Sequence, residues 1–275
     1  MSINEILEIN NLQIIKKQKI IKDSIVLKNP QYVLPTGARN FDETLGGGFQ
    51  QRKKYLIFGA NKTGKTQLCH QLCVQAYIHF SKYIKKYEKE SSNFIFYFDT
   101  ENTFRPERLK EIINNNDAEY NDLLKNIIVS KIMSNSAMLL SLKELENLIK
   151  ANSINILIID TINNHYNSEL ANKDISPIKA KTTFLKILDE INKLTCEYNL
   201  ITITTAQVIS NIISETSIRV VPVGNHLLNQ YFSEYLYLEY KEQDQRYVHL
   251  VNSINLPEKR MLYKITSSGI QDYKI

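Results

Sequence analysis

Apolar residues in most of this chain fall into two alternating patterns. Short, nearly continuous apolar runs predict strands buried on both faces of a sheet. Longer segments with an apolar residue at every third or fourth position predict amphipathic helices. We predict strands over 53–58, 93–98, 126–130, 154–159 and 200–205. We predict helices over 67–80, 106–113, 137–150 and 177–198, with Ser136 as the N-cap of the third. This alternation indicates an α/β fold, with a mostly parallel sheet flanked by helices on both faces.

The two ends of the chain depart from this alternation. After residue 230, polar and apolar residues alternate over 232–240, 246–254 and 261–266, which predicts antiparallel strands at the edge of the sheet. Residues 1–33 keep no strong period, and we expect a short N-terminal arm there rather than a separate helical domain. The expected organisation is therefore this arm followed by one core over 34–275.

Composition and charge narrow the class of protein only slightly. The 275 residues are 43% hydrophobic and 23% charged, as in an ordinary globular protein. No apolar run reaches the length of a membrane span, so we expect no membrane partner and a cytoplasmic or nucleoid-associated location. The net charge of +5 permits nucleic-acid binding without requiring it.

Two local clusters each have a structural and a functional interpretation. Cys69 and Cys73 lie one helical turn apart, and His70 follows Cys69 directly. The three could bind a metal, but their spacing matches no zinc pattern, and packing of reduced thiols in a core helix is favoured. Residues 82–89 interleave lysines with Tyr83 and Tyr87. A solvated loop is the favoured interpretation, and a phosphate-contacting patch with stacking aromatic rings is the alternative.

The strongest chemical signal is the segment GANKTGKT at Gly59–Thr66, between a predicted strand and a predicted helix. A strand, this glycine-containing loop and a helix form a nucleotide-binding P-loop, whose backbone N–H groups surround phosphate oxygens. The sequence thus predicts a nucleoside triphosphate and Mg²⁺ as ligands, with Lys65 on the β- and γ-phosphates and the Thr66 hydroxyl on the metal. The predicted nucleotide-binding residues of this segment are Gly59, Ala60, Asn61, Lys62, Thr63, Gly64, Lys65, Thr66 and Gln67.

Polar residues at the ends of three other predicted strands complete the expected site. Asp160 ends the apolar run ILIID, the Walker B pattern in which a carboxylate supports Mg²⁺. Glu101 follows the run NFIFYF and could activate the attacking water, although an acid before Pro106 could equally be a helix cap. Gln207 follows LITITT, where its amide could sense the γ-phosphate and transmit its presence to the long loop over 208–224.

With these motifs in this order, the chain resembles the RadA/RecA-type recombinase ATPases, closest to an archaeal RadA paralogue. The matching phrases are LPTGARNFDETLGGGF (34–49), GKTQLCHQL (64–72), DTENTFRPERL (99–109), IIDTINNHY (158–166), TAQV (205–208) and KITSSGIQD (264–272). The resemblance implies a RecA-like core, ATP as the nucleoside triphosphate, Glu101 as the catalytic glutamate and Arg108 near the adenine. It also implies that the segments after Asp160 and after Gln207 are DNA-binding loops.

Several features depart from that family. The polymerisation motif F-x-x-A is absent from residues 1–36, and Ala206 replaces an asparagine. The two loops offer mainly Lys173 and Arg219 as cations, so we expect DNA binding to be weak and salt-sensitive.

These departures favour an ATPase of the RadA paralogue type in homologous recombination and repair. Its expected partners are single-stranded DNA, a RadA-type recombinase or other repair proteins, with homo-oligomers as a further option. The alternatives are a filament-forming strand-exchange recombinase and a non-catalytic ATP-bound adaptor.

Overall fold

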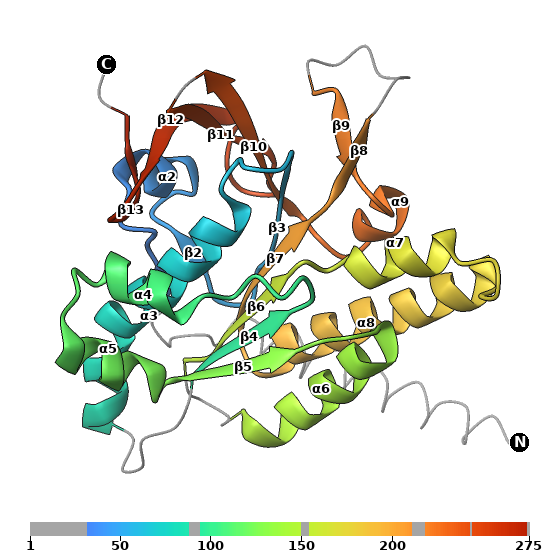
Figure 1. The fold of residues 1–275 in the computed structure, drawn as a ribbon, viewed down its shortest axis with the longest axis horizontal. Helices are drawn as coiled ribbons and strands as arrows, with labels where there is room; N and C mark the ends of the chain where they lie inside the picture. The colour runs from blue at the N-terminus through green and yellow to red at the C-terminus, as the bar shows by residue number, and fades with distance from the viewer. Residues whose placement is uncertain (1–31, 88–93, 150–153, 211–217, 243, 274–275) are drawn as a thin grey trace, which may run out of the picture. The chain divides into compact units, whose positions relative to one another are not determined.

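The central sheet of the computed structural model has the strand order β13-β12-β11-β10-β3-β7-β6-β4-β5 (Figure 1). The structure describes residues 32–87, 94–149, 154–210, 218–242 and 244–273. Six strands run parallel from one edge: β5 (Ile127–Lys131), β4 (Ile95–Asp99), β6 (Ile156–Asp160), β7 (Ile201–Ala206), β3 (Lys54–Gly59) and β10 (Glu234–Glu242). Three antiparallel strands follow: β11 (Gln245–Asn252), β12 (Lys259–Thr266) and β13 (Gly269–Asp272). This confirms the predicted α/β class.

Helices cover both faces of the parallel part of the sheet. One face meets α3 (Lys65–Tyr87), which also contacts α4 (Pro106–Ile112), and α5 (Asp117–Leu124) follows α4. The other face meets α6 (Asn135–Leu148), α7 (Asn164–Ala171) and α8 (Pro177–Glu197) (Figure 1). The smaller elements are β1 (Val33–Leu34) paired with β2 (Phe49–Gln50), α2 (Arg39–Thr44), β8 (Val208–Ser210) paired with β9 (Val220–Pro222), and α9 (Asn225–Leu228). None of the described helices is long and apolar enough to cross a membrane.

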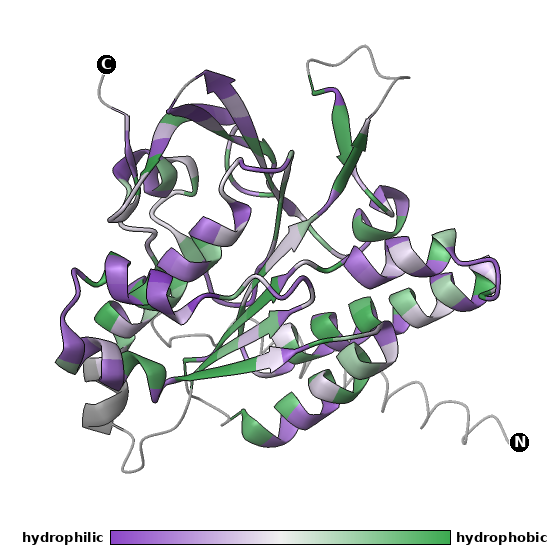
Figure 2. Cartoon of the chain, in the orientation of Figure 1, coloured by the Kyte–Doolittle hydropathy of each residue, from purple (hydrophilic) through white to green (hydrophobic). Residues whose placement is uncertain are grey.

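Strand periodicity divides the core between the two faces of the sheet. Leu56 and Phe58 of β3 pack in one cluster with α6 and α8, for example against Met138 and Phe184. Their neighbour Ile57, also buried, points to the opposite face because successive strand side chains alternate. Both faces of β3 are therefore apolar, which explains its nearly continuous apolar sequence. The buried strand β6 likewise has the hydrophobic colour in Figure 2, whereas the threonine-containing β7 is paler.

The C-terminal strands differ from the prediction in one respect. All of them were expected to be antiparallel additions to the sheet edge, yet β10 pairs in parallel with β3, with Tyr237 beside Phe58. On its other side β10 pairs antiparallel with β11, and β11, β12 and β13 pair antiparallel in turn, as predicted. Alternation of polar and apolar residues indicates that one face of a strand is exposed. It does not indicate whether the neighbouring strand runs parallel or antiparallel.

Two helix ends also differ from the prediction. Ser134 caps α6, because its hydroxyl accepts a hydrogen bond from the Ala137 N–H, whereas Ser136 lies inside the helix. The helix α3 continues to Tyr87, so the loop expected over 82–89 is helical up to that residue. Residues 88–93 lie outside the described part of the chain, as do residues 1–31 of the predicted arm.

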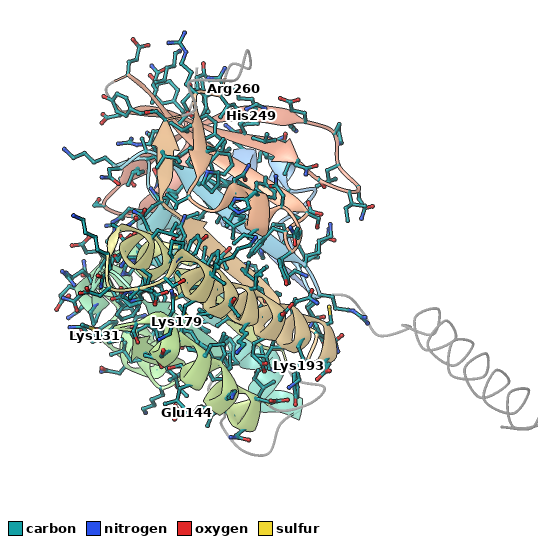
Figure 3. All side chains as sticks on the ribbon, turned by 90° about the vertical axis from the view of Figure 1, so that its right-hand side faces the viewer. Lys131, Glu144, Lys179, Lys193, His249 and Arg260 are labelled. Carbon is teal, nitrogen blue, oxygen red and sulfur yellow. The ribbon has the colours of Figure 1, made fainter. Side chains whose placement is uncertain are left out.

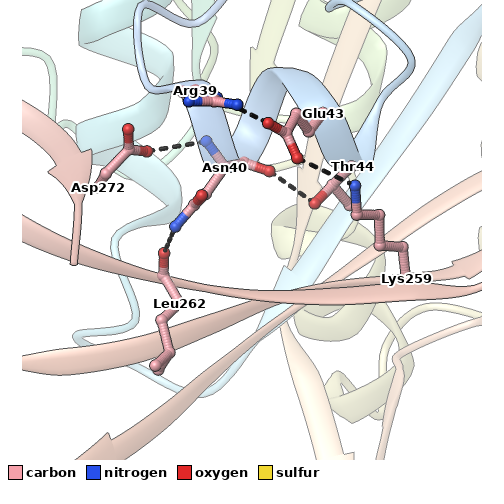
Figure 4. A network of polar contacts seen from close by, with 7 residues as sticks. All are labelled: Arg39, Asn40, Glu43, Thr44, Lys259, Leu262 and Asp272. Carbon is pink, nitrogen blue, oxygen red and sulfur yellow. Dashed lines mark hydrogen bonds and ion pairs between the residues drawn. The ribbon is translucent and has the colours of Figure 1, made fainter. Parts of the chain in front are cut away.

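Polar contacts attach the peripheral elements to the sheet. The Asn40 N–H of α2 donates to Asp272 Oδ1 at 2.8 Å, and the Asn40 side chain donates to the Leu262 carbonyl at 2.7 Å (Figure 4). On the opposite side, Lys193 of α8 forms a 2.7 Å ion pair with Glu146 of α6, and Figure 3 shows Lys193 at that surface. These contacts position α2 against the C-terminal strands and α8 against α6.

Candidate phosphate- and metal-binding site

The loop between β3 and α3 has the conformation that a phosphate-binding loop requires. Gly64 has a φ of +102°, and a Cβ there would lie 2.6 Å from Ile265 Cδ1. A Cβ at Gly59 would collide with the Leu238 carbonyl oxygen. Both positions therefore exclude larger residues, for reasons of backbone conformation and of close packing. The loop ends at Lys65, the first residue of α3, so the helix N-terminus faces the ligand position.

Lys65 lies within this loop with its ammonium folded back on the backbone. Its Nζ donates to the Gly59 carbonyl at 2.8 Å and to the Ala60 carbonyl at 3.0 Å. Burial lowers the pKa of Lys65, while the nearby carboxylates of Asp160 and Glu101 act in the opposite direction. An anionic ligand would add to the effect of these carboxylates, because a nearby negative charge stabilises the ammonium.

The C-terminal strands hold the phosphate loop from outside the motif. The Tyr263 hydroxyl of β12 donates to the Thr63 carbonyl, and Arg246 Nε of β11 donates to the Lys62 carbonyl at 3.2 Å. Ile265 lies directly against Gly64. These residues could not be identified from the sequence, because 200 positions separate Tyr263 from Thr63 and no local motif links them.

Asp160 and Thr66 meet at the predicted metal position. Thr66 Oγ1 donates to Asp160 Oδ2 at 2.7 Å, and the same carboxylate accepts hydrogen bonds from the hydroxyls of Tyr97 and Thr205. Asp160 is 1% exposed. A hydroxyl and a carboxylate oxygen are ligands that suit Mg²⁺, which commonly takes one or two protein ligands and completes its shell with water and phosphate. The donor set therefore fits Mg²⁺; in the described residues there is no cluster of three or more acidic, His or Cys side chains that would form a protein-only metal site.

Asp99 and Glu101 have separate roles in the segment after β4. The Asp99 carboxylate accepts hydrogen bonds from the N–H groups of Glu101, Thr103 and Phe104, at 2.9–3.1 Å. Asp99 therefore holds the turn after β4. Neither Asp99 nor Glu101 caps α4, because its N-cap residue is Arg105 and no side chain makes the cap hydrogen bond. Glu101 instead extends into the phosphate pocket, where its Oε1 accepts from Thr161 Oγ1 at 3.0 Å.

Gln207 joins Glu101 to the β8–β9 hairpin. Its Nε2 donates to Glu101 Oε1 at 2.7 Å and to Asn164 Oδ1 at 3.2 Å. The backbone of Gln207 is held by the Asn163 side chain, which accepts from its N–H at 2.8 Å and donates to its carbonyl at 2.9 Å. The residue thus connects the acid that faces the pocket to the strand that begins at Val208.

A pocket of about 250 Å³ brings most of the predicted residues together. It is lined by Asn61, Lys62, Gly64, Lys65, Thr66, Gln67, Glu101, Asp160, Thr161, Gln207 and Ile265. Gly59, Ala60 and Thr63 support the loop from outside this lining; Thr63 is fully buried and its hydroxyl donates to the Ala60 carbonyl at 2.8 Å. Thr161 and Ile265 were missed, although adjacency to Asp160 is a signal that could have revealed Thr161.

Arg108 lies beside the start of α3 and outside the pocket lining. Its Nε donates to Gln67 Oε1 at 2.6 Å, and its other nitrogens donate to the carbonyls of Thr266 and Ser267 at 2.6 Å each. Arg108 therefore joins α4, α3 and the β12–β13 turn. Its predicted position near an adenine stays a prediction.

The remaining candidates lie apart from the pocket lining. Lys173 is exposed in the turn between α7 and α8, and Arg219 is exposed immediately before β9. Cys69 and Cys73 are both fully buried in α3, as the packing interpretation expects.

Comparison with known proteins agrees with this geometry. Residues 29–273 match the Rad51 family. The chain is 28% identical to the meiotic recombination protein DLH1 of Candida albicans over 94% of this chain and 79% of that protein. It is also 28% identical to the DNA repair and recombination protein RadA of Metallosphaera sedula, over 87% and 72% of the two chains, and to RadA of Methanococcus maripaludis, over 90% and 79%. Since the family match spans nearly the whole described core and includes every strand that carries a pocket residue, this chain belongs to the Rad51 family.

Proposed function

We propose that this protein binds ATP with Mg²⁺, hydrolyses the ATP, and acts in homologous DNA recombination and repair as a paralogue of the RadA recombinases. One observation carries the proposal: Lys65, Thr66, Asp160 and Glu101 line the same pocket at the phosphate loop. An ammonium and a ring of backbone N–H groups bind phosphate, two oxygen ligands support a metal, and a carboxylate is within reach of an attacking water. The recombination role rests on the Rad51 family match and on the named activities of the relatives.

The residues divide the proposed reaction among them. Lys65 neutralises charge on the β- and γ-phosphates, and Thr66 and Asp160 hold Mg²⁺, which supplies Lewis-acid stabilisation of the phosphoryl oxygens when bound. Glu101 orients the attacking water and accepts its proton. Thr161 and Gln207 hold the Glu101 carboxylate through Oε1, which leaves its second oxygen for the water.

The hydrogen bond between Gln207 and Glu101 supports a coupling between nucleotide binding and DNA binding. A γ-phosphate in the pocket would compete for the Gln207 amide, and any movement of Gln207 would be passed to the β8–β9 hairpin that starts at the next residue. Arg219 adjoins this hairpin, and Lys173 lies in the α7–α8 turn. With only these two candidate cations, single-stranded DNA is expected to bind weakly, and a RadA-type recombinase or another repair protein is the proposed second partner.

A filament-forming strand-exchange recombinase is the second candidate, favoured by the similarity to DLH1 over 94% of this chain. Homo-oligomers that grow with ATP and single-stranded DNA, measured by light scattering, would support it. A protein that stays at one size under those conditions would support the paralogue role.

The test of the proposed reaction is the ATPase rate with and without single-stranded DNA. Lys65→Ala should abolish ATP binding in calorimetry. Glu101→Gln should keep ATP binding and lower kcat by about 10²–10⁴, the usual contribution of a positioned general base. Glu107→Gln, an exposed acid in the first turn of α4, is the matched control and should hydrolyse ATP normally. Full hydrolysis by the Glu101 variant would remove that residue from the mechanism.

A further inference from the structure

A second pocket lies beside the β8–β9 hairpin, apart from the phosphate site. Its volume is about 290 Å³, and it is lined by Phe58 of β3, Tyr235 of β10, Val251 of β11 and the strand Val220–Pro222. This volume is close to the lower end of the range for drug-sized ligands, roughly 300–1,000 Å³. The pocket therefore suits a ligand of one or two rings.

Tyr235 supplies an unsatisfied polar group in this mostly apolar pocket. The residue is 5% exposed, and its hydroxyl has no hydrogen-bond partner in the described part of the chain. A buried hydroxyl without a partner is costly, since it has left water and gained no bond in return. Its ring meets Phe58 edge to face, with centroids 6.2 Å apart. The pocket thus presents an aromatic wall together with a hydroxyl able to donate or accept.

Three side-chain amides add further polar groups to the pocket, two of them, at Asn229 and Asn252, on exposed residues. Asn225 and Asn229 line the pocket from α9 and its C-cap, and Asn252 lines it from the end of β11. No charged side chain is among the lining residues. Amides and a hydroxyl offer donors and acceptors together, without charge. This chemistry fits a neutral heterocycle with both kinds of group on its edge, as in a nucleobase.

We propose that the pocket lined by Tyr235 and Val220–Pro222 binds one unstacked base of a single nucleic-acid strand. The proposal deepens the proposed function and rests on its DNA-binding part. The base would enter between the β8–β9 hairpin and the sheet, with its edge on the Tyr235 hydroxyl and the asparagine amides. Arg219 directly precedes β9 and is exposed, so it is placed to contact a phosphate of the same strand. Because β8 directly follows Gln207, a base in the pocket would also alter the position of Gln207, whose amide contacts Glu101.

The test compares an oligothymidine strand with an abasic strand of equal length and charge, using the full chain with ADP and Mg²⁺ in the phosphate site. The wild type should bind the oligothymidine roughly tenfold more tightly, because base contacts on aromatic walls contribute on that scale. Tyr235→Phe removes only the hydroxyl and should weaken oligothymidine binding about fivefold, with no change for the abasic strand. Val251→Phe, which fills the pocket, should abolish the preference for the base-bearing strand.

Tyr240→Phe is the matched control, since Tyr240 is on the same strand, is 52% exposed and does not line the pocket. It should bind both strands as the wild type does, and thermal melting checks that all variants are folded. Equal binding of the two strands by the wild type, or an unchanged preference in both pocket variants, would overturn the pocket proposal while leaving strand binding intact.

A second readout separates this proposal from the proposed function. If neither strand binds, saturation-transfer NMR with free thymidine shows whether the pocket binds a base. Thymidine contact that Val251→Phe abolishes would support the pocket and count against the DNA-binding part of the proposed function. Absence of thymidine contact with the wild type would overturn the pocket proposal as well.

Discussion

His70 is a single residue that joins the phosphate loop to the segment carrying Glu101. Its Nδ1 lies 2.7 Å from the Thr66 carbonyl, and its Nε2 lies 2.9 Å from the Arg105 N–H. Because Nε2 must accept from that N–H, the proton of the neutral ring is on Nδ1. The ring also stacks on Phe104, with centroids 5.2 Å apart. Protonation of Nε2 would therefore break the bond to the segment after β4.

The stability of the protein should fall in acid because of this histidine. Burial lowers the pKa of His70 from 6.5, so the unfolded chain binds a proton at a pH where the folded protein does not. The free energy of unfolding should accordingly decrease as the pH falls below 6.5 towards the folded-state pKa. The slope due to this group is at most about 1.4 kcal/mol per pH unit.

Urea denaturation of the wild type and His70→Gln between about pH 5 and 8 measures this contribution. The difference in unfolding free energy between the two proteins should shrink as the pH falls, because the variant lacks the titrating ring. His79→Gln, an exposed histidine of the same helix, should follow the wild type throughout. A constant difference between wild type and His70→Gln would show that His70 does not titrate as argued.

At the scale of elements, periodicity located the buried strands and long helices but not their ends. β7 shows how a tertiary contact can accommodate polar residues in a buried strand. Its threonines at 202, 204 and 205 are buried, and each hydroxyl is hydrogen-bonded, to the Thr195 hydroxyl, the Tyr55 carbonyl and Asp160 respectively. The ends of helices likewise depend on single hydrogen bonds, and the spacing of apolar residues does not show where those bonds form.

The N-cap of α6 provides a test at this scale. Ser134→Ala removes the hydroxyl that accepts from the Ala137 N–H at 3.0 Å, and should lower the free energy of unfolding by about 1 kcal/mol. Ser136→Ala, the cap expected from the sequence, removes an exposed hydroxyl inside the helix and should be nearly neutral or slightly stabilising, because alanine is the better helix former. Chemical denaturation of both variants compares them directly, and the reverse order of effects would contradict the assignment of Ser134.

At the scale of the whole molecule, the C-terminal strands support a nucleotide loop that lies far away in the sequence. Tyr263→Phe should destabilise the protein by about 1–3 kcal/mol and weaken ATP binding, since the buried Thr63 carbonyl would lose its partner. Thermal unfolding and ATP calorimetry measure the two effects. Tyr273→Phe, which loses a 3.0 Å hydrogen bond from Gln245 at a partly exposed site, should affect ATP binding little. Equal effects of both variants would contradict a specific supporting role for Tyr263.

The charge distribution of the molecule gives a prediction for DNA binding. Replacing both Lys173 and Arg219 by alanine should make the slope of log K against log salt shallower by about 1.4, because each phosphate contact on a single strand contributes roughly 0.7. Fluorescence anisotropy of a labelled single strand over a salt series measures this slope. Lys179→Ala together with Lys193→Ala, two α8 lysines (Figure 3), is the charge-matched control and should leave the slope unchanged. A slope unaffected by the first pair would remove Lys173 and Arg219 from the DNA interface.

The sequence by itself determined the fold class and the residues around the phosphates. Gly64, Lys65 and Thr66 are contiguous, so their relative placement follows from local backbone geometry once a strand and a helix flank them. Asp160 and Glu101 were predictable because each follows a buried strand, and the ends of parallel strands meet at one edge of the sheet.

Only the tertiary structure decided which other residues complete the site. The support of the phosphate loop by Tyr263 and the link from Gln207 to Glu101 depend on the pairing of distant strands. So does the pocket beside the β8–β9 hairpin, whose walls come from β3, β9, β10, β11 and α9. Local periodicity records which residues are buried, and it contains no information about which buried surfaces meet.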